Sequence, residues 1–128
     1  MTEENRIKRS SCPMSCALDI LGDKWTLLVI RDIMFLDKRY FGDFLTSPEK
    51  IASNILSRRL KKLEESNIIL RQLDPGNARR AIYTLTEKGL DLLPAMMELL
   101  RWGAKHDSAS EEHDCSIRQL AQNPDTGD

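Results

Sequence analysis

The chain has 128 residues, of which 41% are hydrophobic and 30% charged; this is typical of one globular domain and excludes a disordered or fibrous protein. Aromatic residues make up only 5%, so we expect a core of Leu, Ile and Met, which favours helices over a β-sandwich. Apolar runs such as 27–30 are far shorter than the roughly 18 residues of a membrane span, and we therefore expect no membrane protein.

The N-terminal residues and the cysteines indicate the cellular compartment of the protein. Residues 1–9 are polar and charged, without the apolar stretch of a secretory signal, so a cytoplasmic protein is expected. Cys12, Cys16 and Cys115 do not have the spacing of a zinc ribbon or a ferredoxin, and in the cytoplasm they are expected to be free thiols. We expect neither a cofactor nor a metal site.

The net charge of −1 is distributed unevenly along the chain. Residues 107–128 carry six acidic side chains and one basic one, whereas residues 50–83 carry eight basic side chains and three acidic ones. A local basic segment predicts an anion-binding surface, with nucleic acid as the first candidate. Solvated charges on helix faces would give the same composition.

Three helices are expected in the first half of the chain. Pro13 fits the first position of a helix over 13–21, which ends at Gly22. Apolar residues at helical spacing predict a central core helix over 24–35, and a short third helix follows over 41–45.

The next segment, 52–66, is predicted to be an amphipathic helix. Its apolar stripe consists of Ala52, Leu56, Leu60 and Leu63. The opposite stripe is polar and basic and consists of Asn54, Ser57, Arg58, Lys61 and Glu65. One face of this helix is thus expected to lie in the core and the other in solvent.

A β-hairpin and a long helix complete the predicted domain. Asn67 is expected in the left-handed conformation that ends a helix, and strands over 68–73 and 79–85 flank a turn at 74–77. A single helix is then expected from Thr86 to about His106. The sequence therefore divides into a polar arm (1–11), a folded domain (12–106) and an acidic, loosely ordered tail (107–128).

This order of elements is that of a winged helix-turn-helix, a mainly α fold with a small β-hairpin, here with a C-terminal dimerisation helix. In this fold the second motif helix enters the major groove of DNA, and the hairpin, or wing, reaches the adjacent minor groove. The residues assigned to base readout are Ser53, Asn54, Ser57 and Arg58. Those assigned to phosphate contacts or minor-groove insertion are Arg59, Lys61, Lys62, Arg79 and Arg80. For Arg59, Lys62 and Arg71, a solvated side chain is an equal alternative, whereas contact with DNA is favoured for Arg58 and Arg79.

Four segments, 12–13, 17–25, 56–64 and 83–89, resemble the HxlR-type winged helix regulators, and the resemblance covers residues 12–106. It implies a homodimeric bacterial or archaeal transcription factor, often a repressor, and some members sense electrophiles or oxidants through a cysteine near the N-terminus. The sequence departs from the pattern at Asn67, where Gly is usual, and at 75–77, where a proline pair is usual.

Cys12 is the candidate redox-sensing residue. It precedes Pro13 at the start of a predicted helix, where the positive end of the helix dipole stabilises a thiolate. A helix-capping residue without redox function is an equal alternative. A Cys12–Cys16 disulfide would have to unwind the helix, because residues one turn apart are too far separated for this bond.

The last helix carries more apolar side chains than a small core needs. Those expected at a dimer interface are Leu92, Met96, Leu99 and Trp102. A twofold dimer sets two DNA-reading helices about 34 Å apart and predicts a pseudo-palindromic operator in double-stranded DNA. The alternative is a monomer in which Leu99 and Trp102 pack on the first helix.

The sequence is also compatible with two other functions. A small thiol-dependent redox enzyme would use Cys12, but no motif places a His or a carboxylate beside it, so we do not expect an enzyme. The other is a winged helix that binds proteins instead of DNA. In such a protein, the face of the helix over 52–66 would be expected to be less basic. A DNA-binding transcriptional regulator, with an effector that the sequence does not identify, is the function that the sequence favours.

Overall fold

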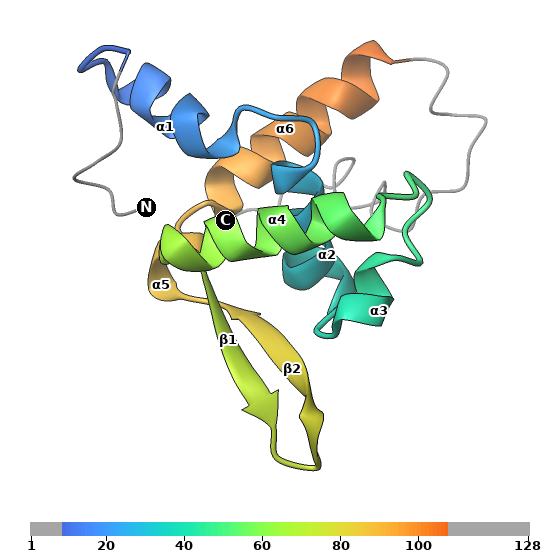
Figure 1. The fold of residues 1–128 in the computed structure, drawn as a ribbon. Coiled ribbons are helices and arrows are strands. Elements are labelled where there is room, and N and C mark those ends of the chain that lie inside the picture. Colours follow the sequence, from blue (N-terminus) through green and yellow to red (C-terminus); the bar gives the residue numbers. More distant parts are fainter. Residues whose placement is uncertain (1–8, 108–128) are drawn as a thin grey trace. The chain divides into compact units, whose positions relative to one another are not determined.

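The computed structural model describes residues 9–107, which form a mainly helical winged helix-turn-helix with one β-hairpin (Figure 1). The elements are α1 (Pro13–Leu21), α2 (Thr26–Leu36), α3 (Phe41–Phe44), α4 (Ser53–Glu65), β1 (Ile69–Asp74), β2 (Asn77–Leu85), α5 (Glu87–Leu90) and α6 (Leu93–His106). They belong to two compact units, which divide between Gly89 and Leu90. The predicted acidic tail and most of the predicted N-terminal arm lie outside the described residues.

Helix α2 begins at Thr26, two residues later than the sequence predicts. The carboxylate of Asp23 accepts hydrogen bonds from the backbone N–H groups of Trp25 (2.8 Å) and Thr26 (2.9 Å) and from the Thr26 hydroxyl. An acidic side chain at this place satisfies N–H groups that have no partner within the helix. Asp23 therefore starts α2 as well as following the end of α1.

The core of the first unit lies between α2, α3, α4 and the hairpin. Its buried apolar side chains include Val29, Ile30, Phe44, Ile51, Leu56, Leu60, Leu63, Ile68, Ile69 and Tyr83. The predicted stripe of α4 is confirmed except at Ala52, which is the exposed N-cap. The α2 side chains Leu28, Ile33 and Met34, and Trp25 at its N-cap, are only half-buried, so α2 is less enclosed than a central core helix would be.

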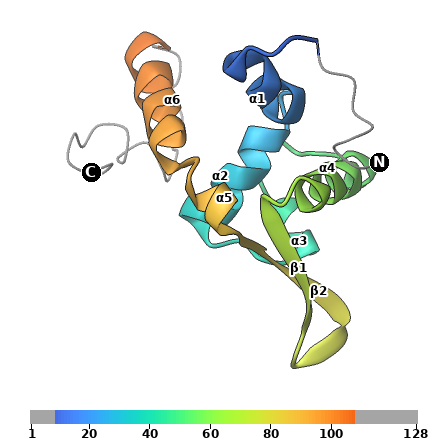
Figure 2. The ribbon, with the colours of Figure 1, turned by 90° about the vertical axis from the view of Figure 1, so that its left-hand side faces the viewer.

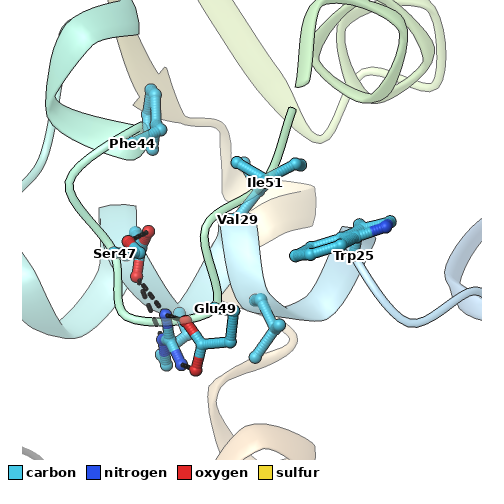
Figure 3. A pocket seen from close by; sticks show the side chains of 9 residues that line it. Trp25, Val29, Phe44, Ser47, Glu49 and Ile51 are labelled. Atoms are coloured by element: carbon cyan, nitrogen blue, oxygen red, sulfur yellow. Dashed lines mark hydrogen bonds and ion pairs between the residues drawn. The ribbon is translucent and has the colours of Figure 1, made fainter. Parts of the chain in front are cut away.

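A polar cluster joins α2 to the segment that leads into α4 (Figure 3). The buried carboxylate of Asp32 accepts hydrogen bonds from the Arg31 guanidinium (2.8 and 3.0 Å) and from the Ser47 hydroxyl. The same guanidinium donates two further hydrogen bonds to Glu49, at 2.7 and 2.9 Å, and Lys38 donates to Ser47 at 2.6 Å. Because a buried charge is tolerated only with such partners, these contacts fix residues 47–49 against α2.

Strands β1 and β2 pair antiparallel from Ile69↔Leu85 to Leu73↔Ala81, with an irregularity between Leu73 and Asp74. Strand β2 begins at Asn77, two residues earlier than predicted, because Asn77 pairs with Asp74 across the turn. The backbone N–H of Tyr83 also donates to the Arg39 carbonyl (2.8 Å), which attaches the base of the hairpin to the segment before α3. The hairpin extends beyond the helices of its unit (Figures 1 and 2).

Residues 86–89 hold the junction between α4 and β1. Asn67 has the predicted left-handed conformation, with φ of 62°. The Thr86 hydroxyl donates to the Asn67 carbonyl at 2.6 Å, and the Thr86 N–H donates to the Ile68 carbonyl at 3.0 Å. Gly89 lies so close to this turn that a Cβ atom on it would be 2.4 Å from the Ile68 carbonyl oxygen.

The single helix predicted from Thr86 to His106 is wrong, because the structure has two helices there, α5 and α6. Pro94 is the physical reason. It has no N–H to donate to the carbonyl of Leu90, and its ring collides with a preceding helical turn. Pro94 therefore belongs to the first turn of a new helix, where a missing N–H costs nothing.

Replacing Gly89 with Ala is expected to lower the free energy of unfolding by about 1–3 kcal/mol, because the added Cβ must displace a backbone carbonyl. Urea unfolding followed by circular dichroism measures this change. Gly42→Ala is the matched control, since nothing lies within 4 Å of its added Cβ and Ala favours helix α3. Equal stabilities of the two variants would contradict this role of Gly89.

Candidate DNA-binding surface

Helix α4 presents a continuous polar and basic face to solvent. The side chains predicted on it, Ser53, Asn54, Ser57, Arg58 and Lys61, are all exposed. They lie opposite the buried leucine stripe, as an amphipathic helix requires. Within the described residues, the only hydrogen bond of the Arg58 side chain is a long one, 3.4 Å, from its Nε to the Asn54 carbonyl. This face thus offers hydroxyl, amide, guanidinium and ammonium groups to an external partner.

Unlike the exposed residues of α4, Arg59 and Lys62 point toward other parts of the protein. The Arg59 Nε lies 3.0 Å from Asp23 Oδ1, and the Lys62 Nζ donates to the Asp19 carbonyl at 3.0 Å. Both side chains are half-buried, and both tie α4 to the end of α1 and the start of α2. Successive helix residues are rotated by about 100°, which puts Arg59 on the flank next to the leucine stripe. That periodicity is the sequence signal that separates Arg59 from its neighbour Arg58.

Asp23 is a functional residue that the sequence reasoning did not identify. Its burial raises the pKa of the carboxyl, but the hydrogen bonds from Thr26 and Trp25, together with the charge of Arg59, bring the pKa down to about 2. The carboxylate is therefore charged at neutral pH. An Asp before a helix is a recognisable cap, but its pairing with a residue 36 positions later leaves no local signal.

The two arginines of the wing also differ. Arg79 is exposed, and within residues 9–107 no hydrogen bond or ion pair engages its guanidinium. The Arg80 Nε lies 2.8 Å from Asp74 Oδ2, and its guanidinium carbon lies 3.9 Å from the centre of the Tyr40 ring. The hydrogen bond to Asp74 raises the pKa of Arg80. The sequence assigns both arginines to DNA contacts, with Arg79 favoured, and among the described residues the structure engages only the Arg80 guanidinium within the protein.

Cys12 lies at the N-cap of α1, as the sequence predicts, and its side chain is exposed. Its side chain makes no capping hydrogen bond, yet the backbone N–H groups of Ser15 and then Met14 lower the pKa of the Cys12 thiol. Cys16 is a half-buried free thiol whose Sγ lies 3.5 Å from the Ser10 carbonyl. Cys115 lies outside the described residues.

Apolar side chains are exposed on α1 and α6. None of the α1 residues is buried, and Met14 and Leu18, one turn apart, are 68% and 48% exposed. On α6, Leu99 and Trp102 are 53% and 67% exposed. Of the other two side chains predicted at a dimer interface, Leu92 is half-buried and Met96 is buried, so Met96 offers little surface to a partner.

Within residues 9–107, no group of three His, Cys, Asp or Glu side chains is placed to hold a metal ion. None of the helices in this part of the chain is both long and apolar enough to cross a membrane.

Comparison with known proteins gives a consistent result. Residues 20–111 match the family described as HxlR-like helix-turn-helix. The HTH-type transcriptional regulator YodB of Bacillus subtilis is 38% identical over 92 residues, which cover 71% of this chain and 81% of YodB. The crystal structure of PA1607 has a TM-score of 0.75 and 33% identity, and the match covers 84% of this chain and 74% of PA1607.

Two further structural relatives are described by their redox state. Reduced YodB has a TM-score of 0.61 and 32% identity over 78% of this chain and 98% of YodB, and diamide-treated and quinone-bound forms of YodB also match. The redox regulator HypR in its reduced form has a TM-score of 0.67 and 25% identity over 80% of this chain and all of HypR.

The family match spans most of the chain, and the fold, the exposed basic face of α4 and the wing agree with it. The chain belongs to the HxlR-like helix-turn-helix family of transcriptional regulators.

Proposed function

We propose that the protein represses transcription as a homodimer, with α4 in the major groove of a pseudo-palindromic operator and the wing along the adjacent minor groove. One observation carries this proposal. The basic residues on the exposed face of α4 have no acidic partner among the described residues, whereas Arg59, on the flank, has one. A face with uncompensated positive charge attracts the phosphate backbone and brings side chains to the base edges.

Within this docking, Ser53, Asn54, Ser57 and Arg58 read bases. Arg can donate two hydrogen bonds to guanine, and Asn can pair in the same bidentate way with adenine. Lys61 lies one turn beyond Ser57 and contacts phosphate, as does Arg79 on the wing. The contacts of Arg59 and Lys62 support a different role for these two residues, which is to hold α4 in place.

A second copy of the chain is the simplest cover for the exposed apolar side chains. Met14 and Leu18 on α1, and Leu99 and Trp102 on α6, expose more apolar surface than isolated surface residues normally do. Twofold pairing through these helices buries that surface and duplicates the DNA-reading helix. A palindromic operator then follows from the symmetry of the protein.

Cys12 is the proposed point of redox control. Its exposure and lowered pKa favour the reactive thiolate, and the relative YodB is known in diamide-treated and quinone-bound forms. With a quinone, the thiolate adds to a ring carbon, a C–S bond forms, and the ring carbonyls take up protons to give a hydroquinone thioether. This change at the start of α1 alters the dimer and releases the DNA.

The thiol-enzyme alternative has less support. Among the described residues, no His or carboxylate is hydrogen-bonded to the Cys12 thiol, as activation of a catalytic thiol would require. The relatives in the family are transcriptional regulators. We therefore propose that the protein is not an enzyme and that it acts on the nucleoid in the cytoplasm.

Replacing Arg58 with Ala is expected to weaken binding by about 1–3 kcal/mol and to relax the preference for one base pair in each half-site, because a bidentate base contact is lost. Lys61→Ala is the matched control, expected to weaken all sequences alike and to reduce the salt slope by about one unit. Gel-shift titrations at several salt concentrations, on a duplex selected from a random library, measure both. An Arg58→Ala variant with unchanged affinity and sequence preference would exclude base readout by this residue.

Replacing Leu99 with Glu is expected to turn the dimer into a monomer at micromolar concentration, because the interface cannot bury an unpaired charge. DNA affinity falls with it, since the two half-sites are no longer bound together. Sedimentation equilibrium measures the mass. Leu45→Glu, at an exposed leucine of the first unit, is the control and should stay dimeric; a monomeric natural chain would refute the dimer.

Cys12→Ser is expected to bind DNA as the natural chain does but to keep the DNA after treatment with diamide or a quinone, whereas the natural chain releases it. Cys16→Ser is the control and should respond as the natural chain does. The rate of alkylation of Cys12 should rise with pH about a midpoint lower than that of an ordinary cysteine, because its lowered pKa increases the thiolate fraction. Release of DNA by the Cys12→Ser variant under the same treatment would show that Cys12 is not the sensor.

A further inference from the structure

We infer that Tyr40, Asp74 and Arg80 form a clamp that fixes the wing against the helix-turn-helix, and that Arg80 is a positioning residue that does not bind a phosphate. The inference rests on the proposed docking of the wing on DNA. It assigns to Arg80 a role opposite to the one that its place in an arginine pair predicts.

Asp74 is the centre of the clamp. Asp74 is the last residue of β1 and is only 9% exposed. Its Oδ1 accepts a hydrogen bond from the Gly76 N–H at 2.9 Å, which shapes the turn of the hairpin. Its Oδ2 accepts from the Arg80 Nε at 2.8 Å and from the Tyr40 hydroxyl at 3.3 Å. One carboxylate thus joins the turn, the returning strand and the segment before α3.

Arg80 is engaged in two directions. Its Nε edge faces Asp74, and the plane of its guanidinium lies over the Tyr40 ring, with 3.9 Å between the guanidinium carbon and the ring centre. Stacking and a charge-assisted hydrogen bond together hold the side chain in one orientation. To turn its Nε toward a phosphate, Arg80 would have to give up the hydrogen bond to Asp74, whereas the Arg79 guanidinium has no such bond to give up.

Tyr40 connects this clamp to the part of the protein that reads bases. It is the N-cap residue of α3, and its N–H donates to Asp43 Oδ2 at 3.1 Å. The preceding residue, Arg39, accepts the backbone hydrogen bond of Tyr83 in β2. The wing is therefore attached to the start of α3 at its base through the backbone and nearer its tip through the clamp.

For the variant Asp74→Asn, the clamp and simple electrostatics predict opposite changes in DNA affinity. Asp74→Asn removes a negative charge close to the DNA and keeps an oxygen that can accept from Gly76. If Arg80 were a phosphate contact held back by Asp74, this variant would bind DNA more tightly. If the clamp positions the wing, the variant binds about tenfold more weakly, because a charged hydrogen bond that orients the wing is lost.

The experiment measures affinity and salt slope on the duplex selected by the natural chain. Asp37→Asn is the matched control, because it removes the same charge from an exposed aspartate between α2 and α3 and should change affinity by less than about twofold. Arg80→Ala should weaken binding with an unchanged salt slope, and adding it to Asp74→Asn should cause no further loss. Tyr40→Phe keeps the ring and should lose part of the affinity.

Tighter or unchanged binding by Asp74→Asn overturns the clamp, and so does a salt slope that falls by about one unit in Arg80→Ala. Thermal unfolding by circular dichroism shows whether each variant is folded; if Asp74→Asn is not, the salt slope of Arg80→Ala decides. Arg79→Ala separates this inference from the proposed docking. If Arg79→Ala changes neither affinity nor slope, the docking of the wing fails; if it shallows the slope while Asp74→Asn is neutral, only the clamp fails.

Discussion

The burial of Leu56, Leu60 and Leu63 is the constraint on which the rest of this structure depends. These three side chains are at most 2% exposed, and their burial fixes the rotation of α4 about its own axis. Each fully buried leucine stabilises the fold by about 1.5–3 kcal/mol, far more than the surface charges of the same helix contribute. Because α4 cannot rotate, its polar face stays in solvent, and the surface proposed to read DNA is a consequence of the core.

Carboxylates and carbonyl groups then select which basic residues are available to DNA. Asp23 forms an ion pair with Arg59, and Asp74 forms one with Arg80. The Asp19 carbonyl accepts a hydrogen bond from Lys62. The basic residues therefore fall into two groups. Some make contacts within the protein, and the others face solvent. The net charge of a segment measures the sum of both kinds, so it overstates the surface that a phosphate backbone can use.

The contacts of α1 give a physical basis for the proposed control by a thiol at its N-terminus. None of the α1 residues is buried, so the helix is held in its unit by few apolar contacts. Its last turn supplies the Asp19 carbonyl to Lys62 of α4, and Asp23 just beyond it pairs with Arg59. A displacement of α1 would therefore act on two polar contacts of the DNA-reading helix without disturbing the leucine stripe.

The elements that depend on local chemistry can be predicted from the sequence alone. Helical periodicity identified α4, the Asp-Pro-Gly-Asn run identified the hairpin turn, Asn67 identified the left-handed residue after α4, and Pro13 identified the start of α1. The family resemblance, carried by four ordered segments, agrees with the family match. These features follow from neighbouring residues, so a single chain read in order contains the information.

The folded arrangement of the chain determines which of the similar basic side chains stay free. Arg58 and Arg59 are neighbours, as are Arg79 and Arg80, yet one of each pair is held by an acid. Arg59 is held by Asp23, 36 positions away, and Arg80 by Asp74 across the hairpin turn. The break before α6 is of a different kind, because Pro94 is a local signal that starts a new helix within a strongly apolar segment. Long-range pairing has no periodic or compositional signature, because it depends on where the fold brings two distant side chains together.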